Sequence, residues 1–341
     1  MIKLSILDQS PIITRSNARE ALKQTIQAAK AADRLGFTRF WVSEHHDTST
    51  LAGSTPEVLI STLAAKTERI RIGSGGVMLP HYSAYKVAEN FRMLEALYPH
   101  RIDLGIGRAP GGMPRATRAL QEGKQRPDYM QQVEDLKGYL TDSLPENHRF
   151  FGLTATPVID SVPDMWLLGS SNGSATVAAL KGTAFTFAHF INAEGGSIVV
   201  HDYKQMFRPS SLYAKPIATV AIFVVCSETD EEADRLAKSL DLRLLMIANG
   251  QRTSESPTVE MAESYPYTLY ELEFVRENRN RMIVGSPESV KSQIETLAKL
   301  YDTDEVMCVV NLPDYESRIR SLELLSKAFN LAHMGVSINE K

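Results

Sequence analysis

Short apolar runs alternate along the chain with segments of helical period. Eight of the apolar runs are typical of β-strands, since they are short, rich in Val, Ile and Phe and end in glycine or polar residues. They cover residues 3–8, 39–44, 70–79, 101–107, 165–171, 184–190, 217–227 and 305–311. Helices are predicted over residues 17–35, 56–67, 84–98, 128–139, 173–182, 230–248, 287–301 and 315–330. Residues 194–207 are ambiguous, and 249–281 are expected to form a long excursion with some helix.

The regular alternation of strand and helix predicts a parallel sheet with helices packed outside it. Eight such units in 341 residues indicate a closed (β/α)8 TIM barrel of class α/β, with extended loops at its C-terminal mouth. A doubly wound open sheet is the competing architecture. The sequence contains no internal repeat and no obvious linker, so we expect one domain over residues 1–341.

Composition adds little beyond excluding some partners. A net charge of −4 with 43% apolar and 23% charged residues is ordinary for a soluble protein and predicts no nucleic-acid surface. The first residues contain no apolar secretory segment, and no apolar run reaches about 18 residues, so we expect no membrane span. Cys226 and Cys308 lie in apolar runs, which favours buried thiols in a reducing cytoplasm.

In such a barrel the chemistry lies at the C-terminal ends of the strands. The second strand ends in "FWVSEHHD", and strand side chains alternate between two faces. Phe40 and Val42 suit the helix-facing side together with Glu44, so His45 is predicted to point into the mouth. A metal site is weakly supported because adjacent strand residues cannot both ligate one metal without a bend. His45 is either an acid–base group or part of a polar strand end.

Two further loops suit an anionic or flat ligand. "GSSNGS", residues 169–174, joins a strand to a helix, and small hydroxyl residues at a helix N-terminus favour phosphate, although a plain N-cap is the alternative. Arg108 ends the fourth strand and could pair with phosphate, with an electron-rich ring or with Glu44. Gly75 and Gly76 indicate a bulge or the close approach of a ligand to the backbone. No glycine pattern matches a dinucleotide fingerprint.

Taken together, these residues resemble the bacterial luciferase-like flavin-dependent oxidoreductases, in particular their single-component branch. The stretch from "FWVSEHHD" to "GRAPGG" and the later "IVGSPESVKSQIE" carry the resemblance, which extends over nearly the whole chain. The resemblance implies a barrel that binds FMN at its mouth, with the catalytic His45 near the reactive edge of the flavin. It implies a non-prolyl cis peptide at Gly75–Gly76 that supports the flavin. The remaining cofactor-binding residues that it implies are Glu44, Arg108, Gly169, Ser170, Ser171 and Ser174.

The resemblance further implies a monooxygenase that uses O2 and reduced FMN, supplied by a separate flavin reductase, on a small organic substrate. It implies a homodimer, for which we expect helices 56–67 and 84–98 to form the contact. Residues 249–281 would form a lid. Relatives commonly have glycine in place of His100, and those with luciferase activity have an acidic residue in place of Ser170, which argues against aldehyde luminescence. A deazaflavin-dependent oxidoreductase, a non-catalytic flavin-binding protein and a metal-dependent hydrolase remain alternatives.

Overall fold

The computed structural model describes residues 2–123, 127–251 and 255–331. The strands of this part are β1 Lys3–Asp8, β2 Arg39–Val42, β3 Arg71–Ser74, β4 Val77–Met78, β5 Ile102–Gly107, β6 Asp164–Gly169, β7 Ala184–Ala188, β8 Ala218–Cys226, β9 Met282–Gly285 and β10 Glu305–Val309. The α-helices are α1 Ala18–Arg34, α2 Pro56–Ala65, α3 Ala84–Leu97, α4 Pro114–Gln121, α5 Tyr129–Leu140, α6 Asn172–Lys181, α7 Gly196–Met206, α8 Asp230–Ala248, α9 Val259–Ser264, α10 Leu269–Asn278, α11 Pro287–Leu300 and α12 Tyr315–Phe329. Two short 3-10 helices are η1 Leu79–His81 and η2 Arg279–Arg281.

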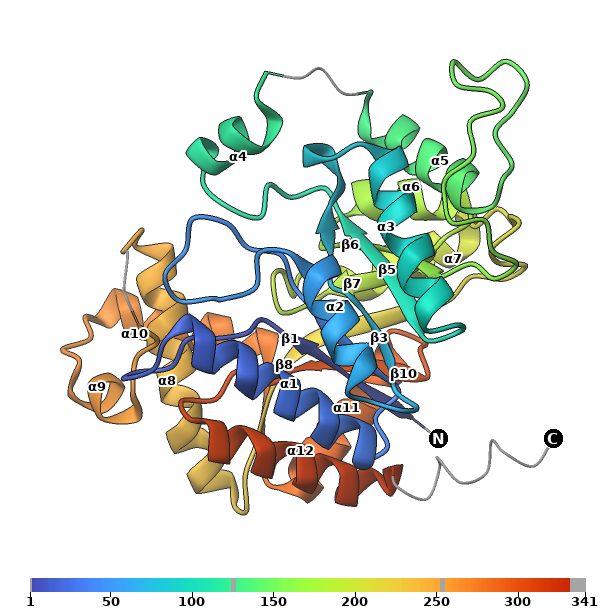
Figure 1. Cartoon of the computed structure of the whole chain (residues 1–341). Helices are drawn as coiled ribbons and strands as arrows, with labels where there is room; N and C mark the ends of the chain where they lie inside the picture. The colour runs from blue at the N-terminus through green and yellow to red at the C-terminus, as the bar shows by residue number, and fades with distance from the viewer. Residues whose placement is uncertain (1, 124–126, 252–254, 332–341) are drawn as a thin grey trace.

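Eight strands form a closed parallel barrel surrounded by helices (Figure 1). The ring runs β1-β2-β3-β5-β6-β7-β8-β10, and it closes because β10 pairs in parallel with both β1 and β8. The predicted TIM barrel is therefore confirmed, and the open doubly wound sheet is not the architecture of this chain. That residues 1–341 form one domain stays a prediction.

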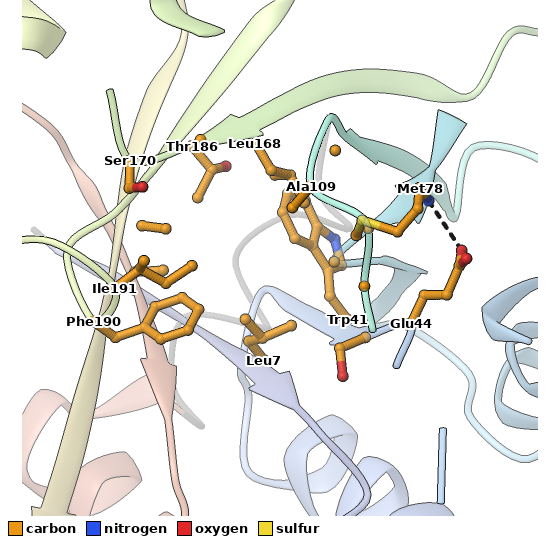
Figure 2. Close-up of a pocket in the computed structure, with 18 of the residues that line it drawn as sticks. Leu7, Trp41, Glu44, Met78, Ala109, Leu168, Ser170, Thr186, Phe190 and Ile191 are labelled. Carbon is orange, nitrogen blue, oxygen red and sulfur yellow. Dashed lines mark hydrogen bonds between the residues drawn. The ribbon is translucent and has the colours of Figure 1, made fainter. Parts of the chain in front are cut away.

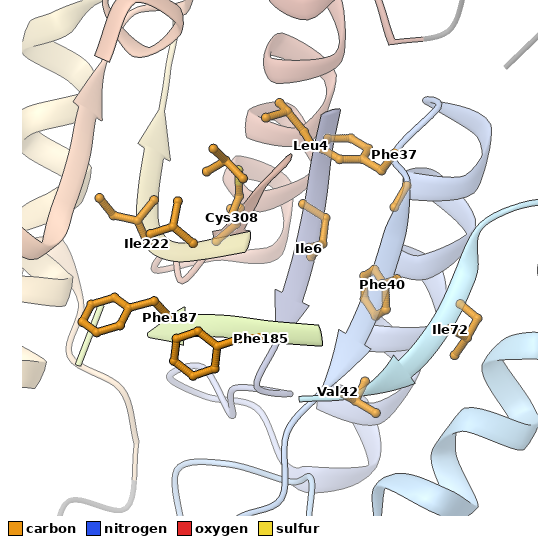
Figure 3. Packing of buried hydrophobic residues seen from close by; sticks show 14 of the residues in the cluster. Leu4, Ile6, Phe37, Phe40, Val42, Ile72, Phe185, Phe187, Ile222 and Cys308 are labelled. Atoms are coloured by element: carbon orange, nitrogen blue, oxygen red, sulfur yellow. The ribbon is translucent and has the colours of Figure 1, made fainter. Parts of the chain in front are cut away.

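Strand side chains alternate between the barrel interior and the helix-facing layer. Figure 3 shows the helix-facing layer, in which Phe40 and Val42 pack with Leu4, Ile6 and other buried apolar side chains. The residues between them point inward, since Trp41 belongs to an interior cluster with members from β1, β6, β8 and β10. The alternation predicted for the second strand is thus confirmed.

A charged network fills the N-terminal part of the barrel interior. The buried carboxylate of Asp103 accepts hydrogen bonds from Nη1 of Arg39 at 2.8 Å and from Nε of Arg71 at 2.7 Å. Arg39 also pairs with Glu305, and Arg71 with Asp164. These contacts join β2, β3, β5, β6 and β10 beneath the mouth. We call this network the charged floor. Apolar side chains and a cavity occupy the barrel interior between the charged floor and the mouth.

Several segments differ from the sequence prediction. The predicted strand 70–79 is broken at Gly75–Gly76 into β3 and β4, and the ambiguous segment 194–207 contains α7. β9 was not predicted as a strand, and it pairs with the outer half of the nine-residue β8. The excursion 249–281 contains α9 and α10, as expected, and Tyr265, Tyr267 and other side chains of it pack on α8. Its role as a lid stays a prediction.

Both cysteines are buried and free, as predicted, and burial raises the pKa of both thiols. No helix within the described ranges is long and apolar enough to cross a membrane. The cytoplasmic location stays a prediction.

Candidate functional site

A cavity of about 330 Å³ opens at the C-terminal ends of the barrel strands (Figure 2). All the residues predicted to act in catalysis or cofactor binding line it. They are Glu44, His45, Gly75, Gly76, Arg108, Gly169, Ser170, Ser171 and Ser174. The barrel therefore brings together loops that follow β2, β3, β5 and β6. The chemical roles assigned to these residues stay predictions.

His45 lies on the cavity side of the loop after β2. Its Nδ1 atom is 3.0 Å from Oγ of Ser43, and its backbone N–H donates to the carbonyl of Gly53. Its Nε2 atom has no hydrogen-bond partner among the residues that the structure describes. Burial, followed by the charges of Arg243 and His46, lowers the pKa of His45 from 6.5 to about 4. The imidazole is therefore neutral at pH 7, with one ring nitrogen left for a ligand.

The carboxylate of Glu44 is turned away from the cavity and is engaged within the protein. It accepts hydrogen bonds from the backbone N–H of Met78 at 2.9 Å and from the Tyr82 hydroxyl at 2.8 Å (Figure 2 shows the first). Its Oε1 atom is also 2.7 Å from Nε2 of His46. These contacts favour a positioning role, in which Glu44 fixes the strand segment that follows Gly76, over direct contact with a cofactor.

The peptide bond between Gly75 and Gly76 is cis, as the resemblance implied. A Cβ atom at Gly75 would lie 2.4 Å from Cδ1 of Leu7, and one at Gly76 would lie 2.7 Å from the carbonyl oxygen of Gly105. There is no room for a side chain at either position. The backbone itself therefore forms this part of the cavity wall, where a flat ring could lie against it.

The loop before α6 and the guanidinium of Arg108 lie side by side at the cavity. A Cβ atom built at Gly173, in the first turn of α6, would lie 3.6 Å from Nη2 of Arg108 and 3.7 Å from Nη1. Ser171 is the N-cap residue, yet its hydroxyl makes no capping hydrogen bond. The free N–H groups of a first turn and a guanidinium repel each other electrostatically unless an anion lies between them. The plain N-cap alternative is therefore disfavoured, and so is an ion pair of Arg108 with Glu44.

Sequence analysis did not single out Tyr129, the first residue of α5. Its hydroxyl oxygen is buried and has no hydrogen-bond partner in the described ranges. Burial raises the pKa of Tyr129, and the positive charge of Arg108 opposes this shift. Such a buried hydroxyl needs a polar partner, although Tyr129 is not among the residues that line the cavity. No local sequence signal distinguishes Tyr129 from other helix-start tyrosines, because the burial of its hydroxyl depends on tertiary packing.

Another part of the cavity wall is apolar, and sequence reasoning did not single it out. Leu7, Phe190, Ile191 and Met307 line it, and in Figure 2 Phe190 and Ile191 face Ala109 across the open space. This wall suits an apolar group of a ligand and excludes water. In the described part of the chain, no three His, Cys, Asp or Glu residues are grouped to hold a metal ion.

Comparison with known proteins identifies the family of this chain. Residues 2–304 match the family model described as luciferase-like monooxygenase. The chain is 54% identical over 331 residues to YwcH of Bacillus subtilis, covering 96% of this chain and 99% of that protein. It is 37% identical over 333 residues to the N-acetyl-S-alkylcysteine monooxygenase of the same species, covering 96% and 98% of the two chains.

Solved structures share the fold over the same extent. The crystal structure of apo-MsnO8 has a TM-score of 0.89 at 36% identity and covers 97% of this chain and 98% of that one. The oxygenating constituent of 3,6-diketocamphane monooxygenase from Pseudomonas putida, solved in complex with FMN, has a TM-score of 0.70 at 20% identity, covering 96% and 97%. An F420-dependent secondary alcohol dehydrogenase has a TM-score of 0.65 at 13% identity, covering 96% and 98%.

Proposed function

Because this chain belongs to the luciferase-like monooxygenase family, we propose that it is an FMN-dependent monooxygenase that uses reduced FMN and O2 on a small organic substrate. The observation that carries the choice of a phosphate-bearing flavin is the set of donors around the first turn of α6. A riboflavin phosphate would meet Arg108, the first-turn N–H groups of α6 and three serine hydroxyls. The FMN complex of a fold neighbour is consistent with this choice.

Each remaining part of the cavity has a role in this proposal. The Gly75–Gly76 backbone supports the flavin ring, and Glu44 holds that backbone in place through the N–H of Met78. Reduced FMN would supply the electrons that activate O2. The neutral imidazole of His45 exchanges a proton through Nε2 or donates a hydrogen bond there. The apolar wall around Phe190 and Ile191 binds the substrate and keeps water out.

We also propose a partner enzyme, a cellular location and an oligomeric state for this protein. A separate reductase would supply reduced FMN, the protein would act in the cytoplasm, and two copies would associate through α2 and α3. The substrate panel should include N-acetyl-S-alkylcysteines, since a relative with 37% identity is named for acting on them.

An anaerobic titration of the full chain with oxidised and with reduced FMN tests the proposal. We expect saturable binding of FMN, weaker binding of riboflavin, which lacks the phosphate, and product formation from a panel substrate once air is admitted. Failure of FMN to bind in either state would contradict the proposal, and binding of F420 in its place would favour the deazaflavin alternative.

His45→Ala tests the role of the imidazole. The variant should bind FMN as the wild type does, because the phosphate and ring contacts are elsewhere. Product formation should fall by about 10²- to 10⁴-fold, the usual contribution of a positioned acid–base group. Unchanged product formation would show that His45 has another role.

A further inference from the structure

Gln9 directly follows β1, and its side chain belongs to the inward-facing row of that strand. Ile6 faces the helices, whereas Leu7 lies in the interior cluster and lines the cavity (Figure 2). Since side chains alternate along a strand, Gln9 is the next inward position after Leu7, one step nearer the mouth. Gln9 is half-buried and lines the cavity. A carboxamide therefore stands on the β1 side of the mouth.

The strand register places Gln9 level with two other residues that line the cavity. The pairing of β1 with β2 and of β2 with β3, continued just past the strand ends, aligns Gln9 with Ser43 and Gly75. Backbone hydrogen bonds extend the ladders this far, because the N–H of Ser43 donates to the carbonyl of Asp8 and that of Gly75 donates to Val42. Gln9 therefore lies one strand from the loop with the imidazole and two strands from the cis peptide.

A buried asparagine determines which end of the Gln9 carboxamide is left for a ligand. Asn311 follows β10, which pairs with the other side of β1, and its Nδ2 atom donates to Oε1 of Gln9 at 2.7 Å. The Nε2 atom of Gln9 has no hydrogen-bond partner in the part of the chain that the structure describes, and it remains accessible. A carboxamide nitrogen only donates hydrogen bonds. Gln9 therefore offers the cavity a neutral donor.

The wall around Gln9 is apolar and uncharged. Leu7, Ala221 of β8 and Met307 of β10 line the cavity on this side. Among the described residues that line the cavity, the ionisable ones are Glu44, His45 and Arg108, which follow β2 and β5. A charged group of a ligand would lose water beside Gln9 without gaining a partner of opposite charge. The group that meets Nε2 is therefore a neutral hydrogen-bond acceptor.

We propose that Gln9 donates a hydrogen bond from Nε2 to a neutral carbonyl oxygen of the substrate, with Asn311 as the positioning residue. This inference rests on the proposed function and specifies its substrate class as a ketone, an ester or an amide. The flavin phosphate is not the acceptor, since β1 lies opposite β6, which leads into α6, in the eight-stranded ring. The apolar part of the substrate lies against Leu7 and Met307, so one hydrogen bond fixes its orientation.

Asn311 decides whether Gln9 presents a donor or an acceptor to the cavity. An asparagine can donate to Oε1 of Gln9, whereas an ionised aspartate only accepts. In Asn311→Asp the carboxamide should therefore turn round, so that Nε2 donates to the new carboxylate and Oε1 faces the ligand. The variant should lose affinity for a ketone and keep its affinity for the matching alcohol, because the alcohol can donate to Oε1. A packing defect would weaken the binding of both alike.

Calorimetry of the full chain at pH 7, with and without oxidised FMN, tests the proposal. The probes are linear and cyclic ketones from cyclopentanone to 2-octanone. Each is paired with its alcohol and with the analogue in which a methylene group replaces the oxygen. In the wild type at least one ketone should bind more tightly than its methylene analogue. Gln9→Met, which keeps the chain length and removes the donor, should weaken ketone binding about 3- to 10-fold and leave the analogue unchanged.

Gln27→Met is the matched control, because Gln27 is an exposed glutamine of α1 and does not line the cavity. It should leave the affinities for all three kinds of probe unchanged. Melting temperatures of the variants at Gln9 and Asn311 verify that both are folded. The alcohol serves as a second check of folding, since Asn311→Asp should still bind it.

Three results would overturn the proposal. The first is that no ketone binds the wild type more tightly than its methylene analogue, and the second is that Gln9→Met or Asn311→Asp retains the wild-type preference. The third is that Gln9→Met weakens FMN and leaves the ketones unaffected, which would assign the donor to the flavin. FMN titrations of the same samples separate the two levels, because loss of FMN binding by the wild type contradicts the proposed function and not the carbonyl preference.

Discussion

The imidazole of His45 is neutral at physiological pH because burial and a nearby guanidinium both disfavour its charged form. Ser43 fixes one ring nitrogen, so the ring is oriented without being charged. A neutral imidazole can donate a proton at one nitrogen or accept one at the other, depending on its tautomer. His45 is therefore suited to move a proton without bringing a permanent charge to the reaction centre.

The titration of His45 provides a direct check. We expect a midpoint near pH 4 in the folded protein, compared with about 6.5 in the unfolded chain. Because the unfolded state binds more protons between these values, His45 should lower the stability of the fold progressively as the pH falls from 6.5 to 4. NMR of labelled imidazoles, with His45→Gln to assign the signal, measures the midpoint. A midpoint above 6 would contradict the inferred environment.

At the scale of elements, the N-terminal end of α6 adjoins the cavity. Its N-cap hydroxyl is unused, and the guanidinium of Arg108 stands beside the first turn. Hydroxyl, guanidinium and amide donors thus converge from β5 and from the β6–α6 loop. Such a convergence selects for phosphate by charge and by the number of acceptor oxygens.

Arg108→Ala is expected to weaken FMN binding by about 10- to 100-fold, because one charge-assisted pair is lost. Riboflavin binding should not change, since riboflavin carries no phosphate, and this comparison is the internal control. Ser174→Ala, which removes one neutral donor, should have a smaller effect in the same direction. Equal losses for FMN and riboflavin would show that Arg108 contacts another part of the flavin.

Sequence patterns predicted the barrel and placed the site residues in the right loops, because period and strand-end position are local properties. β9 was missed because four residues are too few to show a period. Tyr129 was also missed, because the burial of its hydroxyl depends on residues distant in the chain. His100 shows a gain from structure: its φ of 62° lies in the left-handed region, which glycine adopts with the least strain.

At the scale of the whole molecule, the charged floor links five of the eight barrel strands. Asp103 is its centre, because it accepts from Arg39, Trp41 and Arg71 while fully buried. Burial opposes ionisation of this carboxyl group, yet the two guanidinium groups outweigh burial and keep the pKa of Asp103 below its ordinary value. The floor is thus a rigid base under the cavity.

Asp103→Asn should destabilise the protein by about 3–5 kcal/mol, since it leaves buried guanidinium charge uncompensated. In the wild type the contribution of Asp103 should be complete above its unfolded pKa of about 4 and lost as the pH falls through its lower folded value. Urea unfolding at pH 7 measures the loss. Asp304→Asn, which removes one partner of an exposed pair with Lys3, is the control and should cost less than about 1 kcal/mol.

Two adjacent helices on the outside of the barrel expose large apolar side chains. Val58 of α2 and Met93 and Leu97 of α3 are large apolar side chains that are 52–70% exposed on two adjacent helices. Exposed apolar side chains on neighbouring elements are typical of an interface. We expect a dimer through α2 and α3, and we expect Leu97→Glu to dissociate it, because a charge would be buried in the contact.

Sedimentation at micromolar protein concentration distinguishes the dimer from the monomer. Leu300→Glu is the matched control, since Leu300 is equally apolar and 61% exposed but lies on α11, so this variant should sediment as the wild type does. A monomeric wild type would contradict the dimer, and a dimeric Leu97→Glu variant would place the contact on another surface. The cavity lies inside a single barrel, so FMN affinity should be the same in the monomeric variant, and its loss would show that dimer contacts support the site.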